Sequence, residues 1–217
     1  VRRLIAVSEK VRREAVGLLG FPPGRVACIH HGVDAGHFSP DPTGAARERI
    51  RRGLKIPLDA FLIVSVGLSP AKGTETLLEA LALLPEKAWL MVLGEGPRAA
   101  LMGRAVTLGV SGRVVMEGGV DDPLDFYRAA DALAALSYYD AFGLTVLEAM
   151  AVGLPVVASA AMGVSEILSP GVDGLVLPAP PQAREAAAPL MRLMEDADLR
   201  ARMGQPVFDE PFSLHVL

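Results

Sequence analysis

Runs that are apolar at nearly every position alternate along this chain with segments of helical periodicity. Three of these runs are FLIVSV at 61–66, AWLMVL at 88–93 and ALAALS at 132–137. Strands without a polar face are buried on both sides, which is typical of a parallel sheet covered by helices. We therefore predict an α/β fold with a doubly wound parallel sheet, whose ligands bind beyond the carboxyl ends of the strands.

The composition narrows the class of protein. Of the 217 residues 51% are hydrophobic, yet no apolar run is long enough to cross a bilayer, so we predict a soluble globular protein. The net charge of −4 does not indicate a nucleic-acid partner. Cys28 is the single cysteine, which we interpret as a buried thiol in a reducing compartment. The histidines at 30, 31, 37 and 215 lack metal-ligand spacing, so we predict no metal site.

Neither end of the chain has the pattern of a completed domain. It opens on VRRLIAVS without a methionine and closes on EPFSLHVL, whose large apolar groups belong to no finished element. We therefore interpret the chain as a fragment of a longer protein. The stretch at 32–43 is polar and rich in Gly and Pro, and we interpret it as a linker that precedes the main domain at 44–217.

The turn after the run at 61–66 reads GLSPAKGTET and carries a lysine just before a helix. Gly67 allows a sharp turn out of the strand, and Thr74 could cap the helix. An ammonium beside a helix N-terminus is unfavourable unless an anion lies between them. Lys72 is therefore either a phosphate ligand or a solvated loop lysine, and this turn alone does not decide between them.

The next turn, GEGPRA, has the outline of a dinucleotide-binding fingerprint. Gly94, Gly96 and Ala99 follow a strand, and Glu117 comes about twenty residues later, where such folds hold the ribose. An NAD-binding oxidoreductase domain is therefore an alternative. Pro97 removes one N–H donor from this turn, which favours a plain tight connection. The backbone of 117–120, EGGV, either presents its groups to a planar base or forms an ordinary turn.

The stretch Tyr138–Ser159 contains two acids around a tight turn. Asp140 follows a strand, and Glu148 lies within an apolar helical run, where a carboxylate needs partners. If the helix begins near Gly143, its free N–H groups form an anion site between the two acids. Such a site would suit a ligand with phosphate and hydroxyl groups. Helix caps and surface positions are the alternative, but the apolar neighbours of Glu148 favour a role for it. Glu166 is a third acid near a strand end.

Two further segments are ambiguous. The basic run Arg47, Arg49, Arg51, Arg52 and Lys55 could face an anionic acceptor or a membrane, but a solvated helix face is the commoner meaning. The helical segment REAAAPLMRLMED contains Pro189, which we expect to kink or split it.

Several motifs in register resemble one family over almost the whole chain. DAFGLTVLEAMAVGLPVVAS at 140–159, GVSEI and GVDGLV resemble the nucleotide-sugar site of the group 1 retaining glycosyltransferases of GT-B fold, with their signature of an acid, seven residues and Glu-Ala. AVSEKVRREA, HHGVDAGHFSP, VGLSPAKGTETLLEAL and DFYRAADALAALS agree in order. The resemblance implies that residues 1–31 end an N-terminal Rossmann-like domain, and that 44–217 form the C-terminal nucleotide-sugar-binding Rossmann-like domain.

The resemblance also implies roles for single residues. Lys72 and Asp140 would be catalytic, Lys72 by binding the donor diphosphate and Asp140 by contacting the transferred sugar. The remaining donor-binding positions would be Gly67 and Leu68 in the first turn, Gly118 and Val120 at the base, Phe142, Gly143 and Leu144 at the diphosphate, and Glu148 at the ribose. Neither a metal nor a cofactor is implied.

The implied activity is metal-independent transfer of a hexose, with retention, from a nucleotide-diphosphate sugar to a carbohydrate or lipid-linked acceptor. Such a fragment would be inactive alone and cytoplasmic, and the missing half could hold it at the membrane face. Three positions depart from the family: Leu68 replaces an arginine, Asp140 replaces a glutamate, and His31 replaces an asparagine. A non-catalytic relative of GT-B fold is therefore a second alternative.

Overall fold

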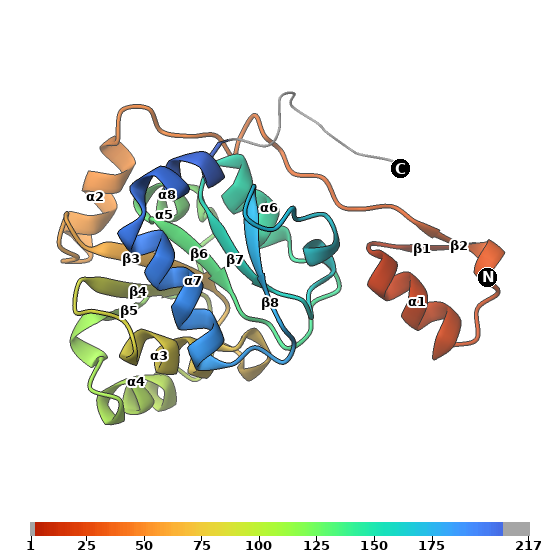
Figure 1. Cartoon of the computed structure of the whole chain (residues 1–217), viewed down its shortest axis with the longest axis horizontal. Coiled ribbons are helices and arrows are strands. Elements are labelled where there is room, and N and C mark those ends of the chain that lie inside the picture. Colours follow the sequence, from red (N-terminus) through yellow and green to blue (C-terminus); the bar gives the residue numbers. More distant parts are fainter. Residues whose placement is uncertain (1–2, 206–217) are drawn as a thin grey trace.

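The computed structural model describes residues 3–205 and contains a small unit and a larger α/β part (Figure 1). The small unit consists of β1 (Leu4–Ala6), α1 (Glu9–Gly17), the short 3-10 helix η1 (Pro23–Arg25) and β2 (Val26–Cys28). Residues 29–44 connect it to the larger part without a helix or strand. The predicted linker at 32–43 falls in this connection, and the division into two domains stays a prediction.

The larger part is built on one six-stranded sheet in which every pairing is parallel. Its strands are β3 (Phe61–Val66), β4 (Ala88–Leu93), β5 (Val114–Met116), β6 (Ala132–Ala135), β7 (Val156–Ser159) and β8 (Gly174–Leu177). Their spatial order is β5-β4-β3-β6-β7-β8, so the direction of winding reverses between β3 and β6. The predicted doubly wound parallel sheet is confirmed.

Helices cover both faces of this sheet, and α7 crosses in front of it in Figure 1. The helices are α2 (Ala45–Gly53), α3 (Thr74–Ala82), α4 (Arg98–Thr107), α5 (Leu124–Ala129), α6 (Leu144–Ala151), α7 (Ala183–Glu195) and α8 (Ala197–Met203). Ile63 of β3 packs with α3, α4 and α7, whereas Leu62 and Val64 pack with α5 and α6. Alternate strand residues thus enter separate cores, which explains why the strand is apolar throughout.

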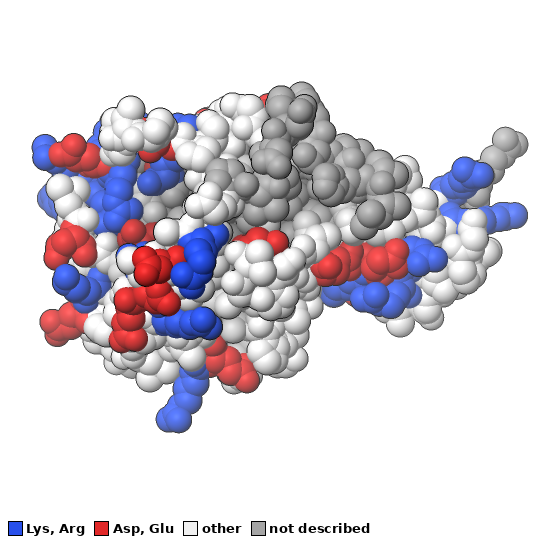
Figure 2. Space-filling model, turned by 45° about the horizontal axis from the view of Figure 1, so that its top comes forward, with Lys and Arg blue, Asp and Glu red and all other residues white. Residues whose placement is uncertain are grey.

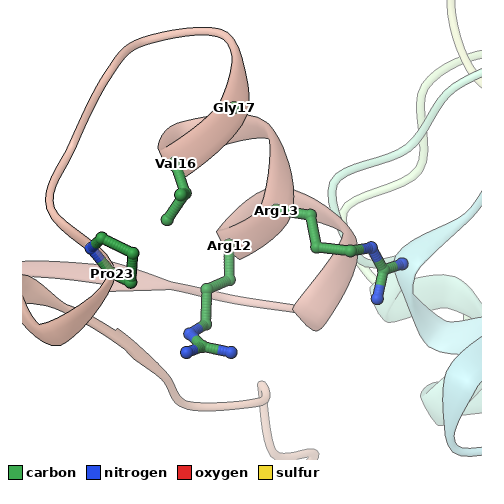
Figure 3. A pocket seen from close by; sticks show the side chains of 5 residues that line it. All are labelled: Arg12, Arg13, Val16, Gly17 and Pro23. Carbon is green, nitrogen blue, oxygen red and sulfur yellow. The ribbon is translucent and has the colours of Figure 1, made fainter.

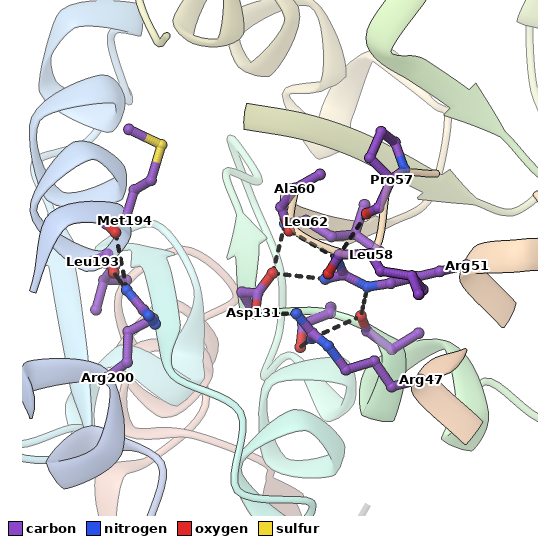
Figure 4. Close-up of polar contacts among 12 residues, drawn as sticks. Arg47, Arg51, Pro57, Leu58, Ala60, Leu62, Asp131, Leu193, Met194 and Arg200 are labelled. Carbon is purple, nitrogen blue, oxygen red and sulfur yellow. Dashed lines mark hydrogen bonds and ion pairs between the residues drawn. The ribbon is translucent and has the colours of Figure 1, made fainter. Parts of the chain in front are cut away.

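Arg51 of α2 is fully buried and joins three segments of the larger part (Figure 4). Its guanidinium donates to the carbonyls of Ala129 and Ala60, at 2.9 and 2.7 Å, and pairs with Asp131 at 2.7 Å. Asp131 also pairs with Arg47 at 2.8 Å. Burial lowers the pKa of Arg51 from its ordinary value, and the Asp131 charge opposes that shift. The prediction of a solvated basic face is therefore wrong for Arg51, because backbone carbonyls and a carboxylate surround it.

Other differences from the sequence-based expectations are local. α7 continues through Pro189 without being split. The segment that contains Glu166 forms the 3-10 helix η4 (Gly163–Glu166). Cys28 is half-buried rather than buried. The segment EPFSLHVL, from which we predicted an unfinished C-terminal end, lies outside the described residues, as does His215.

The surface carries charges of both signs. On the face shown in Figure 2, Lys and Arg are interspersed with Asp and Glu and form no single basic face. Among residues 3–205, no helix combines the length and apolarity that a membrane crossing requires.

Candidate functional site

Lys72 and Asp140 meet where the winding of the sheet reverses. Lys72 ends the 3-10 helix η2 (Pro70–Lys72) after β3, and Asp140 lies in the turn after β6. The Lys72 Nζ lies 2.7 Å from Asp140 Oδ2, and the two side chains are 35% and 20% exposed. The structure thus brings the two predicted catalytic residues into contact at the edge where a doubly wound sheet binds its ligands.

Two glycines give Lys72 its position. Gly67 has a φ of +104°, and a Cβ there would lie 2.7 Å from Lys72 Cγ. Gly73 has a φ of +70°, and a Cβ there would lie 2.2 Å from the carbonyl oxygen of Leu136. Both positions favour glycine: a Cβ would displace the Lys72 side chain at Gly67 or overlap a backbone carbonyl at Gly73, and both φ values are unfavourable for other residues.

The Thr74 side chain has a different structural role from the predicted helix cap. α3 begins at Thr74, its N-cap is Gly73, and no side chain caps it. The Thr74 hydroxyl donates to the carbonyl of Gly67 at 3.0 Å. The prediction that Thr74 caps the helix is wrong, since its hydroxyl closes the loop that carries Lys72.

The N-terminus of α6 faces the same edge. Gly143, with a φ of +111°, is its N-cap, and no side chain caps the helix. Within residues 3–205, the backbone N–H groups of Gly143, Leu144 and Thr145 have no protein acceptor. The Phe142 N–H is occupied, because it donates to Asp140 Oδ1 at 3.1 Å. Free N–H groups at the positive end of a helix dipole favour an anion.

A hollow of about 290 Å³ lies against this helix terminus. Its lining residues are His31, Lys72, Asp140, Ala141, Phe142, Gly143, Leu144 and Thr145. The Phe142 ring is only 2% exposed, and its centroid lies 5.5 Å from the rings of both His30 and His31. A cation, a carboxylate and free amides therefore share one solvent-accessible space.

Glu148 continues this surface along α6. It lies three and four residues after Thr145 and Leu144, which places all three on one helix face. These three residues are at least partly exposed, whereas Val146 and Leu147 between them are buried. Glu148 Oε2 accepts the hydroxyl of Tyr127 at 2.7 Å. Sequence reasoning expected a partner for Glu148 but missed Tyr127, which is on another helix.

The turns after β4 and β5 contact each other. The N–H of Gly94 donates to the carbonyl of Gly118 at 2.9 Å, and the N–H of Gly119 donates to Glu95 Oε1, also at 2.9 Å. Val120 is half-buried against the core that contains α5 and α6. Part of the backbone predicted to receive a base thus has protein partners already, and Glu95 is a neighbour that the sequence did not indicate.

The glycines of the GEGPRA turn are explained by packing. A Cβ on Gly96 would lie 2.6 Å from Leu68 Cβ, and a Cβ on Gly94 would lie 3.3 Å from Gly67 Cα. Leu68 itself is only 1% exposed and belongs to the core. The close approach of the two turns therefore requires small residues. Leu68 was predicted among the donor-binding residues, but its side chain is directed into the core, which leaves only its backbone for a ligand.

The small unit contacts the Asp140 turn through α1. Ser8, the N-cap of α1, accepts the N–H of Val11 and donates its hydroxyl to the carbonyl of Ala141 at 2.8 Å. A Cβ on Gly163 would lie 2.2 Å from that same carbonyl oxygen and 2.7 Å from the Ser8 side chain. Residues 133 positions apart, Ser8 and Ala141, are thus held together next to Asp140.

Glu166 also connects the small unit to the larger part. Its carboxylate accepts the N–H groups of Glu9 and Lys10 at 2.7 and 3.3 Å, and it contacts His30 Nε2 at 2.7 Å. Cys28 lies close enough that the ligand atoms of Cys28, His30 and Glu166 are all within 4.8 Å of one another. The sequence spacing could not show this cluster. Since N–H donors already occupy the carboxylate, the absence of a metal site stays our prediction.

A separate hollow of about 230 Å³ lies on the small unit (Figure 3). It is lined by Arg12, Arg13, Val16, Gly17 and Pro23. Arg12 is already engaged, because its Nε donates to the carbonyl of Val26 at 3.2 Å and its Nη1 pairs with Glu9 at 2.9 Å. The lining contains no acid and no nucleophile, so the edge with Lys72 and Asp140 is the candidate site.

Comparison with known proteins connects this site to one family. The sequence model described as "Glycosyl transferases group 1" matches residues 46–207. D-inositol 3-phosphate glycosyltransferase of Actinosynnema mirum is 37% identical over 191 residues, which are 81% of this chain and 45% of that protein. The Thermobispora bispora protein of the same name is 32% identical over 93% of this chain and 50% of its own length. The chain spans about half the length of these curated relatives.

Solved structures agree with this assignment. Anabaena HepE in complex with UDP and glucose is 26% identical and superposes with a TM-score of 0.87 over 95% of this chain and 57% of that one. The C-terminal domain of LpcC, a group 1 family protein of Francisella tularensis, is 26% identical, with a TM-score of 0.70 over 81% of this chain and 94% of that one. The second match shows that a domain of this kind has been crystallised by itself.

Proposed function

Because the chain belongs to the group 1 glycosyltransferases, we propose that it is the donor-binding part of a retaining, metal-independent hexosyltransferase that uses a nucleotide-diphosphate sugar. The observation that carries this proposal is the hollow shared by the Lys72 ammonium, the Asp140 carboxylate and the N-terminal amides of α6.

The diphosphate would lie between Lys72 and the N-terminus of α6. Breaking the bond between sugar and phosphate develops negative charge on the leaving diphosphate, and fixed donors stabilise that charge without reorganising. The free N–H groups of Gly143, Leu144 and Thr145 and the Lys72 ammonium are such donors. We propose that they carry the stabilisation without a metal ion.

The other groups of the donor would follow the surface away from the diphosphate. Asp140 lies beside Lys72 and would contact the transferred sugar. Glu148, about one helical turn further along α6, would accept the ribose hydroxyls. The backbone at Gly118 and Val120 would receive the base. In this arrangement the two acids act on different hydroxyl groups of one ligand.

The departures from the family pattern affect the diphosphate and the sugar. With Leu68 buried in place of the arginine usual at this position, Lys72 is the one cation that lines the hollow. We propose that the helix amides carry correspondingly more of the phosphate charge. Asp140 is one methylene shorter than glutamate, and its contact with Lys72 supports the proposal that the shorter acid is sufficient.

The donor base, the acceptor and the location are less constrained. Uridine nucleotides are our first choice of base, because the Anabaena HepE structures contain UDP and UDP-glucose. A carbohydrate or lipid-linked acceptor, and a cytoplasmic position near the membrane face, stay predictions from the family resemblance. An acceptor would need contacts beyond those described in this chain.

Calorimetric titration of the chain with UDP-, GDP- and ADP-sugars tests the proposal. We expect saturable binding of at least one nucleotide sugar and no preference for NADH. A titration without binding to any nucleotide sugar at millimolar concentration would contradict the proposal. Saturable NADH binding would instead favour the alternative of an NAD-binding oxidoreductase domain, which the packing of Gly94 and Gly96 does not favour.

A non-catalytic relative remains the second candidate, since Leu68 and Asp140 depart from the pattern of the family. It shares the binding result but predicts that the full-length protein transfers no sugar from any donor that it binds. Product formation by the full-length protein therefore separates the two candidates.

A further inference from the structure

Tyr127 of α5 is a buried residue with one polar atom, and that atom contacts the proposed ribose-binding acid. The side chain has no exposed surface and belongs to the core between the sheet and α6. Its hydroxyl donates to Glu148 Oε2 at 2.7 Å. A buried tyrosine hydroxyl that reaches a partly exposed carboxylate is a directed contact, because the ring cannot move without disturbing the core.

The bond leaves one oxygen of Glu148 available. Within residues 3–205, Tyr127 is the one hydrogen-bond donor to the Glu148 carboxylate, and it uses Oε2. Glu148 lies on the helix face that Leu144 and Thr145 begin, and those two residues line the hollow beside Lys72. Burial, together with the charge of Glu148, raises the pKa of Tyr127 far above its ordinary value. The phenol therefore keeps its proton, which it donates to Glu148.

We propose that Tyr127 is a positioning residue: its hydroxyl holds Oε2 of Glu148 so that Oε1 accepts the ribose hydroxyls of the bound nucleotide. This inference rests on the proposed function. A carboxylate with one oxygen already fixed by a rigid donor loses less conformational freedom when a ligand binds to its other oxygen. This improves its affinity for the ligand groups that the carboxylate contacts. The effect should therefore concern the ribose hydroxyls and not the diphosphate, which binds about one helical turn away.

A purely structural bond between α5 and α6 is the plainer alternative, and it predicts something different. Loss of a structural bond would lower the stability of the fold and would affect all nucleotides alike. Loss of a positioning bond would affect only ligands that carry the hydroxyls. The comparison of UDP with 2′,3′-dideoxy-UDP therefore separates the two explanations.

The experiment is calorimetric titration of the whole chain and its Tyr127→Phe variant with UDP and 2′,3′-dideoxy-UDP. We expect the variant to lose about tenfold in affinity for UDP and less than about twofold for the dideoxy nucleotide, because a hydrogen bond to a charged group is removed. In the Glu148→Gln background, Tyr127→Phe should have little further effect on UDP, because the charged acceptor is already gone.

Tyr139→Phe is the matched control. Tyr139 donates its hydroxyl to Glu14 Oε2 at 2.7 Å, so the variant loses the same kind of bond at the same distance. That bond joins the Asp140 turn to α1 and does not involve α6. We expect Tyr139→Phe to leave the ratio of the UDP and dideoxy-UDP affinities unchanged.

The possible results distinguish the two proposals. If wild-type protein binds none of UDP, GDP and ADP, the proposed function fails, and this inference fails with it. Suppose instead that the wild-type protein binds UDP, but Tyr127→Phe lowers the affinity for UDP and for the dideoxy nucleotide equally, or lowers neither. This inference alone is then overturned. If GDP or ADP binds better, the same comparison uses that nucleotide and its dideoxy form.

Discussion

Lys72 and Asp140 are 68 positions apart in the chain, yet their ammonium and carboxylate groups lie 2.7 Å apart beyond the ends of two adjacent strands. Both groups line the same hollow. A phosphate that enters this space would compete with Asp140 for Lys72. The ion pair therefore holds the ammonium in place before the ligand arrives, and it also opposes the ligand through the charge of the carboxylate.

Replacing Lys72 by methionine should weaken binding of the diphosphate selectively. A charge-assisted bond to phosphate is lost, so we expect affinity for UDP to fall about 10- to 100-fold while affinity for uridine changes little. Lys87→Met is a suitable control, because Lys87 is 70% exposed and pairs with Asp59 just before β4 begins, at the opposite end of that strand. Equal losses for UDP and uridine in calorimetry would remove Lys72 from its proposed role.

Neutralising Asp140 should have the opposite effect on the free nucleotide. In Asp140→Asn the ammonium no longer has a protein counter-charge, and the phosphate no longer meets a nearby carboxylate. We expect UDP to bind about three- to tenfold more tightly, since charges a few ångströms apart near a surface interact by a few kcal/mol at most. The UDP-sugar should gain less, because its sugar loses a contact. Weaker UDP binding would show that Asp140 does not oppose the phosphate.

Gly73→Ala should destabilise the fold strongly. Its Cβ would lie 2.2 Å from the Leu136 carbonyl oxygen, and its φ of +70° is unfavourable for alanine. We expect the free energy of unfolding to fall by about 3 kcal/mol in urea titrations. Gly109→Ala is the matched control, because Gly109 has a φ of +72° with no atom within 4 Å of a Cβ. That variant should lose only about 1 kcal/mol, and similar losses in both would discount the close contact with Leu136.

Arg51→Met should destabilise the protein more than any exchange of an exposed arginine on the same helix. It would leave Asp131 and several backbone carbonyls without their buried donor, so we expect a loss of about 3 to 5 kcal/mol in the free energy of unfolding. Arg49→Met serves as the comparison, since Arg49 is 61% exposed and pairs only with Asp125. Its loss should stay below about 1 kcal/mol. Chemical denaturation measures the free energy of unfolding of both variants. Similar losses would show that the burial of Arg51 does not account for its contribution to stability.

The pattern of apolar runs was sufficient to predict the sheet, because strands buried on both faces have no polar positions. Positions at strand ends then follow from the topology, so Lys72, Asp140 and the start of α6 could be predicted to share an edge. These inferences depend on local sequence alone.

Contacts between distant elements were not predictable in the same way. The basic run of α2 has the composition of a solvated face, but the fold places Arg51 against carbonyls that precede β3 and one at the end of α5. Tyr127 looks like any core aromatic until the fold brings its hydroxyl to Glu148 of α6. Leu68 occupies a position that the family resemblance assigns to the donor, yet an apolar side chain there is more stable in the core than at a phosphate.

The reversal of winding between β3 and β6 has a consequence for how the site is completed during folding. β3, β4 and β5 are consecutive in the chain and lie on one side of the reversal, and β6, β7 and β8 lie on the other. Lys72 belongs to the first half and Asp140 to the second. Each half can form local βαβ pairings separately, but the proposed diphosphate site needs residues of both halves. If that proposal holds, nucleotide binding would report assembly of the complete sheet, which spectroscopic measures of helix content cannot distinguish from two folded but separate halves.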